Sequence, residues 1–216
     1  MTAPASLSAP LRRARFSEAA LTHALADVVS EGHIPDLRCD AYGLGIHRVS
    51  SLARDAGAQE ALLSPRDITD SVLPAAKPGA TTSTRWLEGK DPVITFEADV
   101  ISLKRVPAGT PVSYGYHYRT TQETTLALVS AGFADGVPRT ASRTGRVAVG
   151  GSTHVIAGRI AMDEMVIDIG DATVDLGDVA TIWGLEPTLT QWSVWSGRPE
   201  ALLVSHLAPR VVKIWS

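Results

Sequence analysis

The chain has 216 residues, 44% of them hydrophobic, and a formal net charge of −3. This length suits one domain with an appendage or two small domains, and the charge gives no reason to expect nucleic acid or an anionic membrane as a partner. We find no apolar run long enough for a signal peptide or a membrane span. The single cysteine, Cys39, excludes an intrachain disulfide, so we expect a cytoplasmic protein.

The first part of the chain has helical patterns. Residues 1–10 are small and Pro-containing, which predicts a loose tail. Ser17 can act as an N-cap, and apolar residues follow at helical spacing at Leu21, Leu25 and Val28. A second amphipathic helix is predicted over about 46–58. Prolines and glycine then interrupt every pattern over 64–92, which predicts a loop or linker.

Beyond Asp91 the periodicity changes to the alternation typical of strands. Ile94, Phe96, Ala98 and Val100 alternate with polar residues, and the phase slips at Ile101 and Leu103, which predicts a bulge or a bend around a barrel corner. Gly150-Gly151 predicts a tight hairpin. Further strands are predicted near 124–130, 146–149, 153–160, 164–169, 178–183 and 210–215, with a short helix near 198–206.

These patterns predict a mainly β fold, a small β-barrel or sandwich, preceded by a short helical N-terminal segment. We divide the chain into a helical segment over 1–63, a Pro/Gly-rich linker over 64–91 and a β-domain over 92–216.

Five segments of the β-domain resemble, in order and spacing, the C-terminal β-domain of the alanine racemase family. They are GTPVSYGYHYRT (109–120), LALVSAGFADGVPR (126–139), GGSTHVIAGRIAMDEMVIDIG (150–170), LGDVATIWG (176–184) and HLAPRVVKIW (206–215). The upstream segment LRCDAYGLG (37–45) is similar to the family's VKADAYGHG, at the end of its first barrel strand. A complete racemase also needs a (β/α)8 barrel of about 250 residues, so we expect a truncated member that keeps a vestige of the first barrel unit.

The resemblance implies an enzyme that uses pyridoxal phosphate (PLP), but both catalytic positions have changed. The catalytic tyrosine of the GYxDG motif is Phe133, which has no hydroxyl. The lysine that would form the Schiff base is Arg38, whose guanidinium keeps its proton and forms no imine. We therefore predict that no PLP is bound, unless the family's activity survives elsewhere.

Other motif residues are retained. The resemblance places five of them at or near the substrate entrance, namely Asp135, Arg139, Arg159, Met162 and Asp163. The competing interpretation is structural, because an Asp or Arg beside a β-turn often caps backbone groups. The six histidines lack metal-ligand spacing, so no metal site is predicted.

Three functions are compatible with these observations. The first is a noncatalytic partner or regulator of a racemase, because in the family the β-domain of one subunit completes the active site in the barrel of another. The second is a residual PLP-dependent racemase, an isomerase of D-alanine metabolism. The third is a homo-oligomeric binding or structural remnant. We expect the chain to self-associate or to bind a full-length racemase, since a β-domain without its barrel exposes apolar surface.

Overall fold

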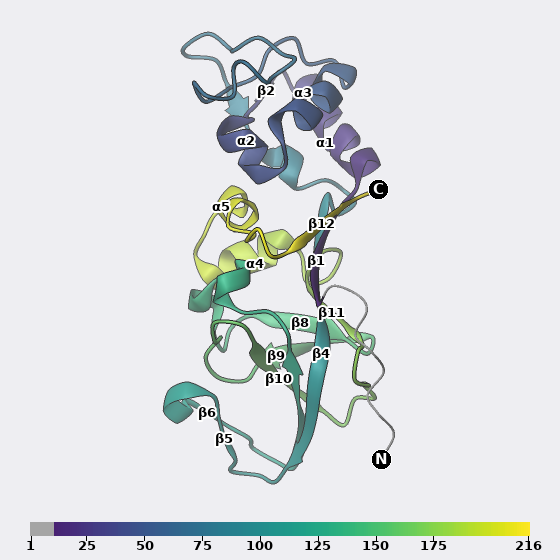
Figure 1. Ribbon diagram of the computed structural model, residues 1–216, viewed down its shortest axis with the longest axis vertical. Helices are drawn as coiled ribbons and strands as arrows, with labels where there is room; N and C mark the ends of the chain where they lie inside the picture. The colour runs from purple at the N-terminus through teal and green to yellow at the C-terminus, as the bar shows by residue number, and fades with distance from the viewer. Residues whose placement is uncertain (1–10) are drawn as a thin grey trace. The chain divides into compact units, whose positions relative to one another are not determined.

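The computed structural model of the protein describes residues 11–216, so the predicted tail over 1–10 lies outside it. The chain forms two compact units (Figure 1). We call the first the β unit; its described residues are 11–14, 95–197 and 208–214. We call the second the helical unit; it comprises Arg15–Ile94, Arg198–Leu207 and Trp215–Ser216. The units are defined by packing and not by chain order, so the predicted ranges 1–63, 64–91 and 92–216 stay a prediction.

The β unit is built on a closed barrel of six antiparallel strands, which confirms the predicted mainly β fold. The strands follow the order β11-β8-β9-β10-β7-β4, and β4 pairs back with β11. Closure leaves no strand edge of the barrel unpaired. The barrel strands are β4 (Ile94–Val106), β7 (Thr124–Val129), β8 (Arg146–Val149), β9 (Ser152–Ile156), β10 (Met165–Gly170) and β11 (Val179–Trp183).

The barrel core is formed by alternate residues of each strand. On β4 the side chains of Phe96, Ala98 and Val100 are buried, and the register with β7 shifts between Val100 and Ser102. This shift confirms the predicted bulge, which lets one long strand pair with both β11 and β7. The other buried residues of the barrel strands include Ala127, Val129, Val147, Val149, Ile156, Ile167, Ile169, Ala180 and Ile182.

The β8–β9 hairpin is closed by the predicted glycine pair. Gly150 and Gly151 have φ of 59° and 76°, the left-handed region that a tight hairpin requires. A side chain at Gly150 would also place its Cβ 2.8 Å from the Thr173 carbonyl oxygen. Glycine is therefore required there for two reasons. The large sheet also contains β1 (Arg12–Phe16) and β12 (Val212–Trp215). A separate two-stranded sheet is formed by β5 (Pro111–Val112) and β6 (Tyr118–Arg119).

One helix of the β unit was not predicted from the sequence. Helix α4 (Leu189–Ser196) begins with a capping box between Thr188 and Gln191. It buries Trp192, whose ring meets the fully buried Trp183 edge-on at 5.7 Å. The tryptophans at the end of this unit are thus mainly core residues.

The helical unit contains the predicted N-terminal helices. Helix α1 (Glu18–Ser30) starts at Ser17, whose hydroxyl accepts the Ala20 N–H, and it buries the expected apolar face. Helix α3 (Ile46–Asp55) ends before the predicted 58 because the chain turns at Gly57, where φ is 98°. The predicted short helix near 198–206 is α5 (Glu200–Ser205).

A small parallel ladder connects these helices. Strands β2 (Ile34–Pro35) and β3 (Thr82–Ser83) pair in parallel, and parallel bridges join Asp36 to Leu62 and Ala61 to Ala75. The loop-rich segment 64–91 takes part in this ladder and buries Trp86, whose indole N–H donates to the Asp36 carbonyl at 3.1 Å. The segment is largely irregular, as predicted, but it contributes the fully buried Trp86 to the core of the helical unit.

Within residues 11–216, no helix combines the length and the apolar character needed to cross a bilayer.

The barrel core generates a prediction about stability. Ile167 on β10 is fully buried, so Ile167→Ala should lower the free energy of unfolding by about 2–5 kcal/mol, and Ile167→Val by about 0.5–1.5 kcal/mol. Val166, on the opposite face of the same strand, is only half-buried, and Val166→Ala serves as the control. Urea unfolding followed by tryptophan fluorescence measures all three. Equal costs at the two positions would contradict the assigned strand register.

Candidate functional site

Phe133, which the resemblance aligns with the family's catalytic tyrosine, lies in a turn held by backbone hydrogen bonds. After β7 the chain forms a short 3-10 helix, η3 (Phe133–Asp135). The Phe133 N–H donates to the Ala161 carbonyl at 3.0 Å and the Ala134 N–H to the Met162 carbonyl at 2.9 Å. Gly132 permits this approach, because a Cβ there would lie 2.4 Å from the Ala161 oxygen. The turn holds Phe133 at the surface, with 38% of the residue exposed.

The carboxylate of Asp135 holds this turn from inside. It is fully buried and accepts the Gly132 N–H at 2.8 Å. Arg210 donates to both carboxylate oxygens, at 2.6 and 2.9 Å, and Arg12 Nε lies 3.0 Å from Oδ1. Arg210 also donates to Asp163 at 2.7 Å. Asp135 therefore has a structural role in the turn and its carboxylate does not face solvent.

The remaining entrance-like residues lie on the surface of the β unit. Met162 is 56% exposed. The Arg139 guanidinium lies over the Phe133 ring, 5.6 Å from its centroid. Arg159 contacts His117, with 3.1 Å between its Nη2 and Nε2 of the imidazole. A guanidinium can only donate, so Nε2 of His117 is the acceptor in this pair.

These residues fall into two groups. Phe133, Asp135, Met162 and Asp163 come together through the turn and the loop before β10. Arg139 and Arg159 line a surface pocket of about 550 Å³ together with residues that the sequence did not single out, His117, Thr140, Ser142 and Arg143. Arg12 and Arg210 were also missed as partners of Asp135, although Arg210 belongs to the terminal motif that the resemblance identifies.

Two of the family-like motifs are joined by a polar cluster on the barrel. The Tyr118 hydroxyl, from GYHYRT, donates to the Asp168 carboxylate at 2.7 Å, and the Thr124 hydroxyl donates to the other oxygen of the same carboxylate. Burial and the neighbouring carboxylate raise the pKa of Tyr118. This hydroxyl therefore stays protonated and is a structural donor.

Arg38, which the resemblance aligns with the family's Schiff-base lysine, lies in the helical unit. Its Nε and Nη2 donate to the two oxygens of Asp36 at 2.9 and 2.6 Å, a bidentate pair. Burial raises the pKa of Asp36, but the hydrogen bonds from Arg38 outweigh it and the pKa is lowered overall. Asp36 in turn raises the pKa of Arg38. The guanidinium is thus held charged and paired.

The residues after Arg38 form an unusual backbone. Cys39, Asp40, Ala41 and Tyr42 all have φ between 50° and 58°, one left-handed turn made without glycine. Such a conformation costs roughly 1–2 kcal/mol per residue. It is held by side-chain acceptors outside the turn: the Cys39 N–H donates to the Ser64 hydroxyl at 2.9 Å and the Asp40 N–H to Asp67 at 3.2 Å. Sequence patterns did not predict this segment, because local propensity opposes it.

Among the residues that the structure describes, no group of three or more His, Cys, Asp or Glu side chains is arranged to hold a metal ion.

The β unit is a closed six-stranded antiparallel barrel that carries a GFADG turn anchored by two arginines. Comparison with known proteins identifies the family to which this β-domain belongs. Residues 93–215 match the family model described as the C-terminal domain of alanine racemase. The chain therefore belongs to the alanine racemase C-terminal domain family.

Curated alanine racemases are similar to this chain in sequence. An alanine racemase of Frankia casuarinae is 38% identical over 176 residues, which cover 77% of this chain and 45% of that protein. One from Streptomyces coelicolor is 42% identical over 131 residues, covering 59% of this chain and 34% of that protein. The chain thus spans less than half the length of these curated relatives. The crystal structure of alanine racemase from Streptomyces lavendulae aligns with a TM-score of 0.82 at 19% identity, over 97% of this chain and 98% of that one, which shows the shared fold.

The buried carboxylate generates a prediction for this site. Asp135→Asn keeps the shape but removes the counter-charge of Arg12 and one of the two carboxylate partners of Arg210, so it should lower the free energy of unfolding of the β unit by about 3 kcal/mol. The control is Asp163→Asn, which removes an exposed partner of the same Arg210 and should cost less than about 1 kcal/mol. Urea unfolding of both variants measures the difference. Equal losses would show that Asp135 does not anchor the turn.

Proposed function

We propose that this protein is a noncatalytic member of the alanine racemase family that acts as a partner or regulator of a full-length racemase in the cytoplasm. The observation that carries the proposal is Phe133. The turn that would present a catalytic tyrosine is complete, with its anchoring carboxylate and two arginines, but the side chain that it presents has no proton to transfer. The residues that hold the turn are retained, but the hydroxyl that would transfer a proton is absent.

Racemisation by this family requires two bases and PLP as the electron sink. The residue at the position of the PLP-binding lysine does not fit that role: Arg38 is engaged with both oxygens of Asp36 and has no amine that could form an imine. The lysines at 77, 90 and 104 are exposed. We therefore propose that the protein does not use PLP.

Exposed apolar side chains around the turn support the docking role. Phe133 and Met162 lie on two segments joined by the backbone hydrogen bonds Phe133 N–H to Ala161 and Ala134 N–H to Met162, and they are 38% and 56% exposed. Tyr114 and Tyr116 are 69% and 64% exposed on the same unit. Aromatic and Met side chains of this kind are typical of the centre of protein interfaces. The partner that fits is the barrel of a racemase, which in the family receives this turn from another subunit.

The absence of a cofactor role can be tested directly. After incubation with PLP and reduction with borohydride, peptide mapping should find no stoichiometric, site-specific lysine label, because no lysine occupies the position of Arg38. Phe133→Tyr should also leave alanine racemisation undetectable, since a single restored hydroxyl supplies only one of two bases. Stoichiometric labelling of one lysine, lost when that lysine is replaced, would favour the alternative of a residual racemase.

The docking role predicts a specific complex. Sedimentation of the protein mixed with the full-length racemase of the same organism should show a new, faster species. Phe133→Asp should weaken this complex about tenfold or more, because it places a charge in an apolar contact. The matched control is Val194→Asp, on α4 and 76% exposed, which should leave the complex unchanged.

Two results would contradict this proposal. A chain that stays monomeric at high concentration and ignores the racemase would exclude docking. Self-association without racemase binding would favour the homo-oligomeric alternative instead.

A further inference from the structure

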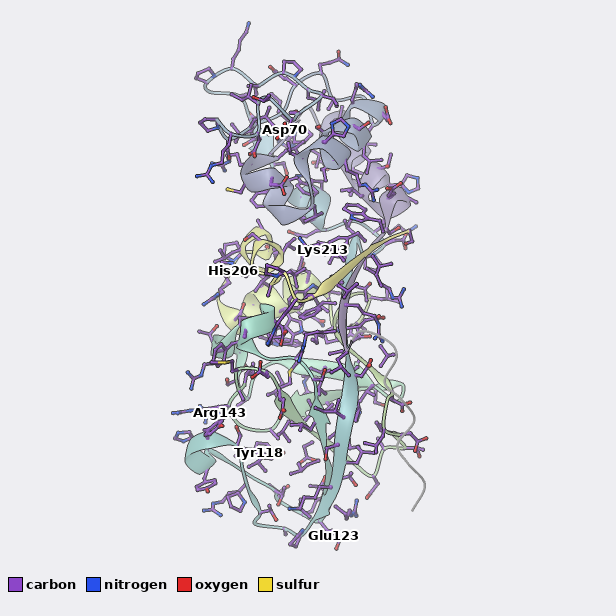
Figure 2. All side chains as sticks on the ribbon, in the orientation of Figure 1. Asp70, Tyr118, Glu123, Arg143, His206 and Lys213 are labelled. Atoms are coloured by element: carbon purple, nitrogen blue, oxygen red, sulfur yellow. The ribbon has the colours of Figure 1, made fainter. Side chains whose placement is uncertain are left out.

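The surface pocket of the β unit gathers positive charge from separate parts of the chain. Arg139 belongs to the 3-10 helix η4 (Arg139–Ala141), Arg143 follows it in the next loop, and Arg159 lies in the loop between β9 and β10. All three are exposed residues, and Arg143 is labelled in Figure 2. With His117, Thr140 and Ser142 they line a cavity of about 550 Å³, within the size range of small-molecule sites.

The charge of this pocket is not balanced by carboxylates. Across residues 11–216, no Asp or Glu forms an ion pair with Arg139, Arg143 or Arg159. Elsewhere in the same structure arginines are paired, as Arg105 is with Glu123 and Asp171 at 3.0 and 2.6 Å. In a protein whose net charge is −3, three unpaired guanidinium groups around one cavity create a local positive potential that attracts an anion.

The pocket is held in place by the surrounding backbone. The Ser113 hydroxyl donates to the Arg159 carbonyl at 2.7 Å, and the Ser142 hydroxyl joins the Arg139 carbonyl to the Ile160 N–H, at 2.6 and 3.1 Å. Arg143 has a φ of 71°, an uncommon conformation for a residue with a side chain, of the kind found at ligand-binding positions.

One glycine leaves room for the His117 side chain that lines the pocket. A Cβ at Gly115 would lie 2.9 Å from His117 Nε2 and 3.7 Å from Arg159 Cζ. The His117 imidazole therefore packs against the Gly115 backbone, and it is this ring that contacts the Arg159 guanidinium at 3.1 Å.

We propose that this pocket binds the phosphate group of a small phosphate monoester. Each guanidinium presents a planar pair of donors that matches two phosphate oxygens, and phosphate near neutral pH carries close to two negative charges. A carboxylate carries only one charge and has fewer oxygens to share among three arginines. The proposal does not rest on the regulatory role, because the arginine cluster and not Phe133 is the ligand-binding group, although Arg139 also contacts the Phe133 ring.

Calorimetric titration of the whole protein with inorganic phosphate and with phenyl phosphate, at low salt in a phosphate-free buffer, tests the site; benzoate is the carboxylate control. Both phosphate probes should bind, and benzoate should bind about tenfold more weakly or not at all. The pocket variant replaces three arginines with glutamine, at positions Arg139, Arg143 and Arg159. The matched variant removes the same charge at three exposed arginines outside the pocket, Arg66, Arg119 and Arg146.

The pocket variant should lose about tenfold or more in phosphate affinity, while the matched variant binds like the unmodified protein. The single variant Arg143→Gln, at an exposed side chain, should give a smaller loss and covers the case in which the triple variant does not fold. The proposal is overturned if the unmodified protein binds neither phosphate probe, if both triple variants weaken equally, or if benzoate binds as well as phenyl phosphate.

Discussion

The buried carboxylate of Asp135 sets the geometry of the whole turn region. A charge removed from water is tolerated only where donors and opposite charges surround it, and here the donors are the Gly132 N–H, Arg12 and Arg210. These residues are far apart in the chain, at 12, 132–135 and 210. One carboxylate therefore ties the beginning and the end of the β unit to the turn in its middle, and the position of Phe133 follows from that network.

This network holds the turn independently of the side chain at position 133. Asp135, Gly132 and Arg210 are needed for the turn to fold, whatever side chain stands at position 133. The phenyl ring of Phe133 is partly exposed and the Arg139 guanidinium lies over it, so a ring without a hydroxyl leaves no buried donor or acceptor unsatisfied at this position. The ion pairs and hydrogen bonds that hold the Asp135 carboxylate do not involve the side chain at position 133.

Much of the fold follows from local patterns. The alternation of apolar and polar residues predicted β4 and its irregularity near Val100–Ser102. The pair Gly150-Gly151 predicted a hairpin whose turn requires positive φ. The N-cap Ser17 and the apolar spacing after it located α1. Helix α4 was not predicted because its burial depends on Trp183 from strand β11. The left-handed turn over Cys39–Tyr42 was not predicted because Ser64 and Asp67 stabilise a backbone conformation that the residues of the turn themselves disfavour.

The sequence by itself determined the family and the mainly β architecture, and it places Arg38 and Phe133 where the resemblance expects a lysine and a tyrosine, because motif order and residue identity are properties of the chain alone. Only the tertiary structure decided what the retained polar residues do. Asp135 is withdrawn into an ion-pair network, while Arg139 and Arg159 meet Arg143 around an exposed pocket. Burial and charge pairing depend on neighbours distant in sequence, and no local pattern records them.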